Sequence, residues 1–347
     1  MMKRLNSKGV ILITTIIIAL LVIVIDNADD DFQMEHPDTS GINQNIKIER
    51  FHKDLTAHIP ADSNDIAMLK EKYGAYFDAF CQYEIEVGSP DSAQIIRNLN
   101  GFLHWEELPS VLQTVDSVFT EDVFNDIESR LSDAFACMKV LIPSINEPHI
   151  ASHCSGFNSN ILVDSTYISF SVEHYLGSDC RYYEWLQTPM YSRRAKSTEY
   201  IAADIIKCWL YANFPDVSSQ HDVINAMIYQ GKILYAARRL MPTEPLKHIF
   251  GYNDADMQWC KDNEKLIWTG LVDKKLLYDN SPMDINKLVR DAPFTAQFGQ
   301  NVPGRAALFC AFRIVCNYME NNPTTILADL LNEPDAQKIL MGAKYTP

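Results

Sequence analysis

One helix-forming segment carries the side chains with the clearest capacity for chemistry. Residues 197–213 place Asp204, Lys207 and Tyr211 at three- and four-residue steps, so the three side chains share one face of the predicted helix. An acid and a base at this spacing form an ion pair, which on an exposed helix contributes only a few tenths (~0.3) of a kcal/mol. We therefore expect a solvated Asp-Lys pair here. The opposite face, with Trp209, is expected to pack in the core.

Aromatic residues gather in the same part of the chain and predict either a core layer or the wall of a groove. They are Tyr182, Tyr183, Trp185, Tyr191, Trp209 and Tyr211. Trp185, Trp209 and Tyr211 are the candidate groove aromatics, with a peptide or a glycan as the ligand such a groove would take.

Metal or cofactor chemistry has no support in the motifs. The chain contains no intact H-E-x-x-H, Walker A, G-x-S-x-G or G-x-G-x-x-G motif. Only His149 and His153 stand four residues apart, and on a strand that spacing separates them by about 13 Å, too far for one ion. We expect His174 to lie on the surface or in a pocket, and Arg238 and Arg239 to favour a helix C-terminus. No cofactor is predicted.

Periodicity predicts an α+β fold in which helices dominate. N-terminal helices are followed by a small antiparallel sheet within 148–176, where β-branched and aromatic residues alternate with turn residues, and then by a C-terminal helical region. Thr120 is the expected N-cap of one helix, and Pro143 is expected to end it. The expected helices are 62–85, 91–102, 120–142, 197–213, 219–240, 253–272, 284–290, 303–321 and 323–341.

Charge excludes one class of function. The 30 Lys and Arg residues against 45 Asp and Glu give a net charge of −15, which opposes binding to phosphate backbones, so no nucleic-acid partner is expected. With 47% hydrophobic residues the chain is globular.

The N-terminus has the order of a membrane-targeting sequence. Residues 1–9 contain three bases and no acid, residues 10–25 contain no charge, and residues 26–40 contain six acids and no base. The predicted organisation is a cytoplasmic stub (1–9), a membrane anchor or signal segment (10–25), an acidic linker (26–48) and a single extracytoplasmic domain (49–347). The favoured interpretation is an uncleaved inner-membrane anchor with the main domain in the periplasm; a cleaved signal peptide and a buried core helix are the alternatives. A lipoprotein is disfavoured because the first cysteine is Cys81.

The eight cysteines include no C-x-x-C pair. Several lie in apolar helical patterns, where a thiol behaves as a small hydrophobic group. Cys154 and Cys180 are the pair expected to form a disulfide, if any pair does.

Several colinear blocks resemble a known family. Residues 140–183 end in Tyr175-Leu176-Gly177, and residues 227–242 (MIYQGKILYAARRLMP) contain a Gly-Lys-Ile-Leu-Tyr core. Shorter matches are IFGY (249–252), WC (259–260), IW (267–268), LY (277–278), APFT (292–295), PGR (303–305), IVCNYM (314–319) and KYTP (344–347). In this order they resemble the gliding-motility lipoprotein GldB family of the Bacteroidetes. The resemblance implies an envelope protein of a motility machinery that is coupled to type IX secretion.

The strand-helix-helix order also looks like the core of zinc peptidases with an H-E-x-x-H motif. In that comparison Ala203 and Lys207 replace the two His ligands, Asp204 replaces the catalytic Glu, and Gln230 replaces the third ligand. The resemblance implies a degenerate zincin-like core with Asp204, Lys207 and Gln230 in a vestigial pocket and no zinc.

Three functions follow as hypotheses. The first is a non-enzymatic, membrane-anchored envelope protein that binds other envelope proteins in a gliding or secretion-associated assembly. The alternatives are a hydrolase or peptidase-like enzyme with an unrecognised site, and a groove that binds a peptide or a glycan.

Overall fold

A computed structural model describes residues 32–218 and 220–347. Residues 36–347 form one compact unit. The predicted cytoplasmic stub (1–9), the membrane segment (10–25) and the first part of the acidic linker lie outside the described residues. Residues 36–48, expected to be linker, belong to the folded unit, because Ile46 and Ile48 are buried in it.

No helix in the described part of the chain has both the length and the apolar composition needed to cross a bilayer.

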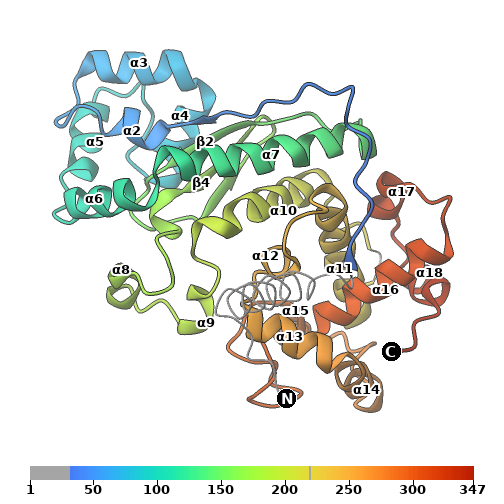
Figure 1. The fold of residues 1–347 in the computed structure, drawn as a ribbon. Coiled ribbons are helices and arrows are strands. Elements are labelled where there is room, and N and C mark those ends of the chain that lie inside the picture. The colour runs from blue at the N-terminus through green and yellow to red at the C-terminus, as the bar shows by residue number, and fades with distance from the viewer. Residues whose placement is uncertain (1–31, 219) are drawn as a thin grey trace, which may run out of the picture. The chain divides into compact units, whose positions relative to one another are not determined.

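A small sheet lies near the centre of the N-terminal half (Figure 1). Its strands are β1 (Ile48–Glu49), β2 (His149–His153), β3 (Ile161–Val163) and β4 (Tyr167–Ser171), in the spatial order β1-β2-β4-β3. β1 pairs with β2, and β2 with β4, in parallel, whereas β3 is antiparallel to β4.

The expectation of an antiparallel sheet is therefore wrong for most of its pairs. A tight turn does join β3 to β4, because the Asp164 carboxylate accepts hydrogen bonds from the main-chain N–H groups of Thr166 and Tyr167. β2 and β4, however, are joined by a connection long enough to cross over and return in the same direction. β1 lies in the segment that was expected to be an acidic linker, so no local pattern predicts a strand there or its pairing with β2.

Helices make up most of the rest, and the predicted helix-dominant α+β class is confirmed. They are α2 (Phe51–Leu55), α3 (Ser63–Tyr73), α4 (Ala75–Ala79), the π-helix η2 (Phe80–Glu84), α5 (Ile95–Leu103), α6 (Leu108–Val118), α7 (Glu121–Leu141), the 3-10 helix η3 (Val172–His174), α8 (Arg181–Trp185), α9 (Met190–Arg193), the 3-10 helix η4 (Thr198–Tyr200), α10 (Ile201–Asn213), α11 (Val223–Leu240), α12 (Leu246–Phe250), α13 (Asp254–Asp262), α14 (Glu264–Asp273), α15 (Pro282–Val289), α16 (Ala307–Asn321), α17 (Leu327–Asn332) and α18 (Ala336–Ala343).

Local signals account for several helix ends. Thr120 caps α7 by accepting a hydrogen bond from the N–H of Val123, as predicted, and α7 ends at Leu141, before Pro143. The helix expected over 62–85 is broken at Gly74, whose φ of +50° lies in the left-handed region. The helix α6 was not expected, because Pro109 at its first turn reads as a loop signal although proline is tolerated there.

The two faces of the sheet are covered by different helices. On one face Tyr76 of α4 stacks on Tyr167 of β4, with ring centroids 4.7 Å apart, and donates a hydrogen bond to Ser169. The opposite face carries Ile168 and Phe170, and α10 packs there against β3 and β4. Since α10 also contacts α7, α11 and α12, it connects the sheet to the C-terminal helices (Figure 1).

The expected disulfide between Cys154 and Cys180 is wrong. Cys154 is a buried free thiol beside Glu173, and Cys180 is a free thiol that precedes α8. The burial predicted for most cysteines is confirmed for six of the eight.

The C-terminal half is built around the contact of α11 with α16. Gly231 permits the close approach, because a Cβ atom there would lie 2.6 Å from the main-chain oxygen of Ala311. Such a contact is shorter than van der Waals separation and would force the two helices apart.

Replacing Gly231 with Ala should therefore destabilise the fold although alanine is the better helix former. We expect a loss of about 1–3 kcal/mol in the free energy of unfolding, measured by chemical denaturation. The matched control is Gly101→Ala in α5, where an added Cβ meets nothing within 4 Å. That change should stabilise by up to about 1 kcal/mol, and equal effects at the two positions would contradict the packing explanation.

Candidate functional site

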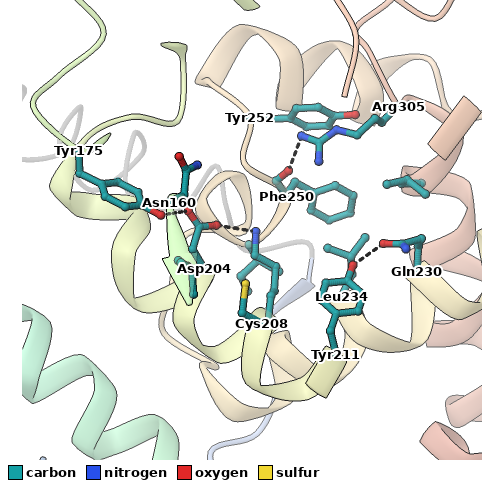
Figure 2. Close-up of a pocket in the computed structure, with 14 residues that line it drawn as sticks. Asn160, Tyr175, Asp204, Cys208, Tyr211, Gln230, Leu234, Phe250, Tyr252 and Arg305 are labelled. Carbon is teal, nitrogen blue, oxygen red and sulfur yellow. Dashed lines mark hydrogen bonds and ion pairs between the residues drawn. The ribbon is translucent and has the colours of Figure 1, made fainter. Parts of the chain in front are cut away.

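A cavity with a volume of about 400 Å³ lies beside α10 and is lined by both polar and apolar side chains. We call it the α10 pocket. Residues from β3, α10, α11, α12 and the segment before α16 meet in it (Figure 2). Its lining residues are Asn160, Ile161, Tyr175, Asp204, Lys207, Cys208, Tyr211, Gln230, Leu234, Ile249, Phe250, Tyr252, Arg305 and Leu308.

Asp204 lies on the wall of this pocket with both carboxylate oxygens engaged. Lys207 approaches Oδ1 with its Nζ at 2.9 Å, and the Tyr175 hydroxyl donates a hydrogen bond to Oδ2 at 3.0 Å (Figure 2). The pKa of Tyr175 is raised well above its ordinary value, first by burial and then by the Asp204 charge. The expected ion pair is present. It lies in a pocket, with less than a quarter of either side chain exposed, so it is not a fully solvated surface pair.

Tyr211 and Gln230 connect the two helices that form the floor of the pocket. The Tyr211 hydroxyl of α10 donates a hydrogen bond to Oε1 of Gln230 on α11 (Figure 2). Burial raises the pKa of Tyr211, so the hydroxyl keeps its proton and remains the donor. Asp204, Lys207 and Gln230, singled out in the sequence as one vestigial pocket, thus all line the same cavity.

Arg305 closes the pocket opposite α10. Its Nη2 donates a hydrogen bond to the main-chain oxygen of Phe250 at 3.0 Å, and its guanidinium carbon lies 5.4 Å from the centre of the Tyr252 ring. Its φ of +63° is left-handed, which is unusual for a residue with a Cβ atom. No sequence pattern predicts that Arg305, Tyr252 or Asn160 lines the pocket, because all three lie far from α10 along the chain.

The three candidate groove aromatics are not brought together. Trp209 is 2% exposed and its indole N–H donates to the main-chain oxygen of Asn146, so it is a core residue. Trp185 is 61% exposed on α8, and Tyr211 lines the α10 pocket. Helical periodicity separates Trp209 from Tyr211 on α10, as predicted, so one packs in the core and the other lines the pocket, while Trp185 lies on a different helix.

The donor atoms of the α10 pocket do not fit zinc. Where the peptidase comparison requires imidazoles, Ala203 offers no donor, and Lys207 carries an ammonium group that repels a divalent cation. Within the described ranges no three or more His, Cys, Asp and Glu side chains are placed to hold a metal ion. We therefore assign no metal chemistry to this pocket.

A second hollow lies at the other face of the sheet, between η2 and the edge strand β3. We call it the β3 groove. Its volume is about 350 Å³, and its lining is mostly apolar or aromatic. The lining residues are Tyr76, Ala79, Phe80, Tyr83, Glu84, Leu162, Val163, Asp164 and Tyr167. No local sequence pattern predicts this groove, because it depends on the pairing of β3 with β4.

Comparison with known families decides the relationship. The family model for the gliding motility protein GldB matches residues 33–347. The chain belongs to the GldB family. Membership identifies it as a gliding-motility-related protein of the cell envelope. No curated protein and no solved structure matches the chain.

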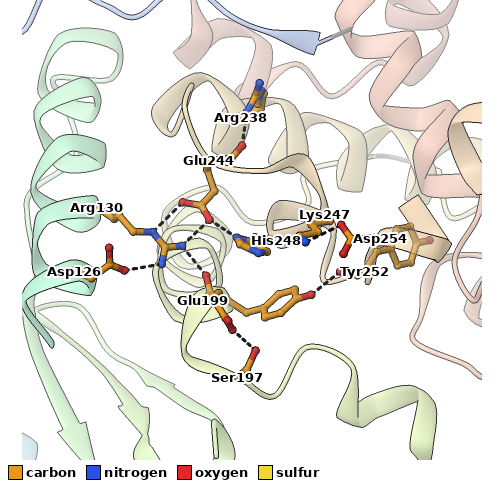
Figure 3. A network of polar contacts seen from close by, with 11 residues as sticks. Asp126, Arg130, Ser197, Glu199, Arg238, Glu244, Lys247, His248, Tyr252 and Asp254 are labelled. Carbon is orange, nitrogen blue, oxygen red and sulfur yellow. Dashed lines mark hydrogen bonds and ion pairs between the residues drawn. The ribbon is translucent and has the colours of Figure 1, made fainter. Parts of the chain in front are cut away.

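In this GldB-family fold a buried carboxylate holds the elements around α10 together. Glu244 accepts hydrogen bonds from Nε and Nη2 of Arg130 at 3.0 and 2.5 Å, and His248 lies 2.6 Å from the same carboxylate (Figure 3). The Arg130 guanidinium also donates to the main-chain oxygen of Glu199, at the start of α10. Arg238, expected to favour a helix C-terminus, lies in the last turn of α11, is 3% exposed and donates a hydrogen bond to the main-chain oxygen of Glu244, which is a structural role.

The sheet of the GldB-family chain also encloses buried titratable groups. His52 is buried and lies 2.8 Å from Ser152 of β2, and burial, with the nearby Lys53 charge, lowers its pKa to about 3. His174 lies 2.8 Å from the ammonium group of Lys196, and burial together with that charge lowers its pKa to about 4. His174 was expected on the surface or in a pocket; it is partly buried and lines neither the α10 pocket nor the β3 groove.

These two histidines should make folding sensitive to acid. Below pH 6.5 the unfolded chain protonates both, whereas the folded chain keeps them neutral until about pH 4 and 3, so each proton lowers stability as the pH falls. Each contributes a slope of about 1.4 kcal/mol per pH unit. His52→Gln should reduce the slope between pH 6.5 and 4 by about one proton, measured as unfolding free energy against pH.

The control for this prediction is His104→Gln, at an exposed histidine. It should keep the slope of the parent. An unchanged slope in His52→Gln would show that His52 takes up its proton in the folded state as readily as in the unfolded chain.

Proposed function

We propose that this GldB-family chain acts in the envelope without catalysis, by binding other proteins of the gliding machinery. The family resemblance connects that machinery with type IX secretion, and we extend the proposal to such assemblies. The competing proposal is a peptidase-like enzyme that uses the α10 pocket.

The state of Asp204 carries this proposal. In the H-E-x-x-H comparison it has the position of the catalytic base, which needs a free carboxylate oxygen facing a metal-bound water. Here both oxygens are taken up, one by Lys207 and one by Tyr175. A carboxylate neutralised in this way, beside Ala203 and Lys207 in place of ligands, serves to position α10 better than to activate water.

We further propose that residues 10–25 hold the chain in the inner membrane with the folded unit in the periplasm. The basic segment before the apolar run and the acidic segment after it support that orientation, because positive charge is retained in the cytoplasm.

The test is isolation of the full-length protein, with a C-terminal affinity tag, from detergent-extracted membranes of gliding cells. We expect it to elute with another envelope protein in fixed stoichiometry, with substoichiometric zinc by elemental analysis, and with the intact mass of the uncleaved chain. The same tag on an unrelated exported domain is the control. If the protein elutes without a partner, or with stoichiometric zinc and peptide hydrolysis, the proposed binding role is wrong. If the measured mass lacks the N-terminal residues, the proposal of an uncleaved membrane anchor is wrong.

A further inference from the structure

The two edge strands of the sheet, β1 and β3, differ in whether their outward-facing main-chain groups have hydrogen-bond partners. At the β1 edge the N–H of Ile48 donates to Oε1 of Glu128 at 3.1 Å, and its carbonyl accepts a hydrogen bond from Nη1 of Arg50 at 2.7 Å. Side chains therefore satisfy the outward-facing main-chain groups of that edge. An edge closed in this way is not available to another strand.

The β3 edge is open. The carbonyl of Asn160 and the N–H of Asp164 pair with β4, at 2.8 Å each. Because the direction of main-chain groups alternates along an antiparallel strand, those of Ile161 and Val163 face away from β4. No hydrogen bond to these outward groups is found among the described residues.

The amino-acid types in β3 do not protect this edge against pairing with another strand. Natural edge strands are commonly protected by lysine, proline, a bulge or a covering segment. β3 has the sequence Ile161-Leu162-Val163, without lysine or proline, and Val163 is 38% exposed. Such a strand is a template for a further one.

The two hollows described above flank this edge on opposite faces of the sheet. Ile161 contributes to the α10 pocket on one face, and Leu162 contributes to the β3 groove on the other. Side chains of an added strand would alternate between the same two faces, since the period of a strand is two residues. The hollows therefore lie on the two faces towards which consecutive side chains of an added segment would point.

We propose that the β3 edge binds an extended segment of a partner polypeptide as a fifth strand. This inference rests on the proposed binding role and gives it a site. Main-chain groups of the segment pair with Ile161 and Val163. An apolar side chain enters the β3 groove against Phe80 and Tyr83, and the adjacent polar side chain meets Asn160 and Gln230 in the α10 pocket.

Charge favours a neutral or basic segment of another protein over a second copy of this chain. Each copy carries a net charge of −15, which opposes self-association. Asp164 and Glu84 line the β3 groove and add local negative charge beside the apolar site. Because residues two apart on a strand share a face, a segment with an apolar residue and a lysine or arginine two positions away fits these surroundings.

The experiment selects peptides from a random displayed library on the full-length protein in detergent, and measures their binding to defined variants. Val163→Pro removes an outward N–H without removing a bond to β4, and Tyr83→Ala opens the β3 groove. The matched controls are Val217→Pro, in an exposed loop where the N–H has no hydrogen bond within the described part of the chain, and Tyr278→Ala, at another exposed tyrosine.

Enriched peptides should bind Val163→Pro and Tyr83→Ala at least about tenfold more weakly than the parent, and the controls within about twofold. A peptide can also be N-methylated on its main chain, at the apolar residue or at either neighbour, which leaves every side chain intact. At one of these positions the methyl group should weaken binding to the parent protein by a similar factor. This last result keeps the test decisive if Val163→Pro does not fold.

Two results would overturn the proposal. One is that no peptide is enriched, or that the enriched peptides bind both variants as tightly as the parent. If envelope proteins still co-purify in that case, the binding role stands and the binding surface lies elsewhere on the protein. The other is a dimer of the parent that Val163→Pro abolishes, which would assign the β3 edge to a second copy of the chain.

Discussion

The arrangement around α10 depends on the pairing of Arg130 with Glu244. Glu244 is 5% exposed, and a carboxylate that is so far removed from water is costly unless its charge is matched and its oxygens are hydrogen-bonded. Arg130 supplies a two-pronged interaction from α7, and His248 adds a contact from α12. Because Arg130 also holds the carbonyl of Glu199, the same guanidinium fixes the point at which α10 begins.

From that fixed start, the position of α10 determines both the pocket and one boundary of the binding edge. α10 packs across β3 and β4, so its polar face, with Asp204 and Lys207, turns towards the end of β3. Opposite, η2 places Phe80 and Tyr83 along the other side of the same strand. A π-helix widens the turn and shifts side chains out of α-helical register, and such segments are frequent at functional sites. The two hollows are thus consequences of how two helices meet one short strand.

The sequence was informative where signals are local. Helical periodicity, the Thr120 cap and the i,i+3 relation of Asp204 and Lys207 all act within a few residues, and each has its counterpart in the structure. Gln230 could be placed in the pocket because the spacing of a peptidase motif relates two adjacent helices. Arg305 and Asn160 could not, because they reach the pocket through pairings that no local pattern encodes. The strand directions were missed for the same reason, since β1 and the crossover between β2 and β4 depend on long-range contacts. Trp209 was predicted both as a core residue and as a candidate groove aromatic, and its place on the apolar face of residues 197–213 was the signal that proved right.

If a partner polypeptide adds a strand at β3, as we propose, its binding must change amide hydrogen exchange at that edge of the GldB-family sheet. In the free protein the amides of Ile161 and Val163 should exchange rapidly, while Leu162, which faces β4, is protected. With a selected peptide bound, the account predicts that exchange at both Ile161 and Val163 slows by at least about tenfold, as expected when a main-chain hydrogen bond forms. Protection that appears elsewhere while these two amides remain unchanged would contradict it.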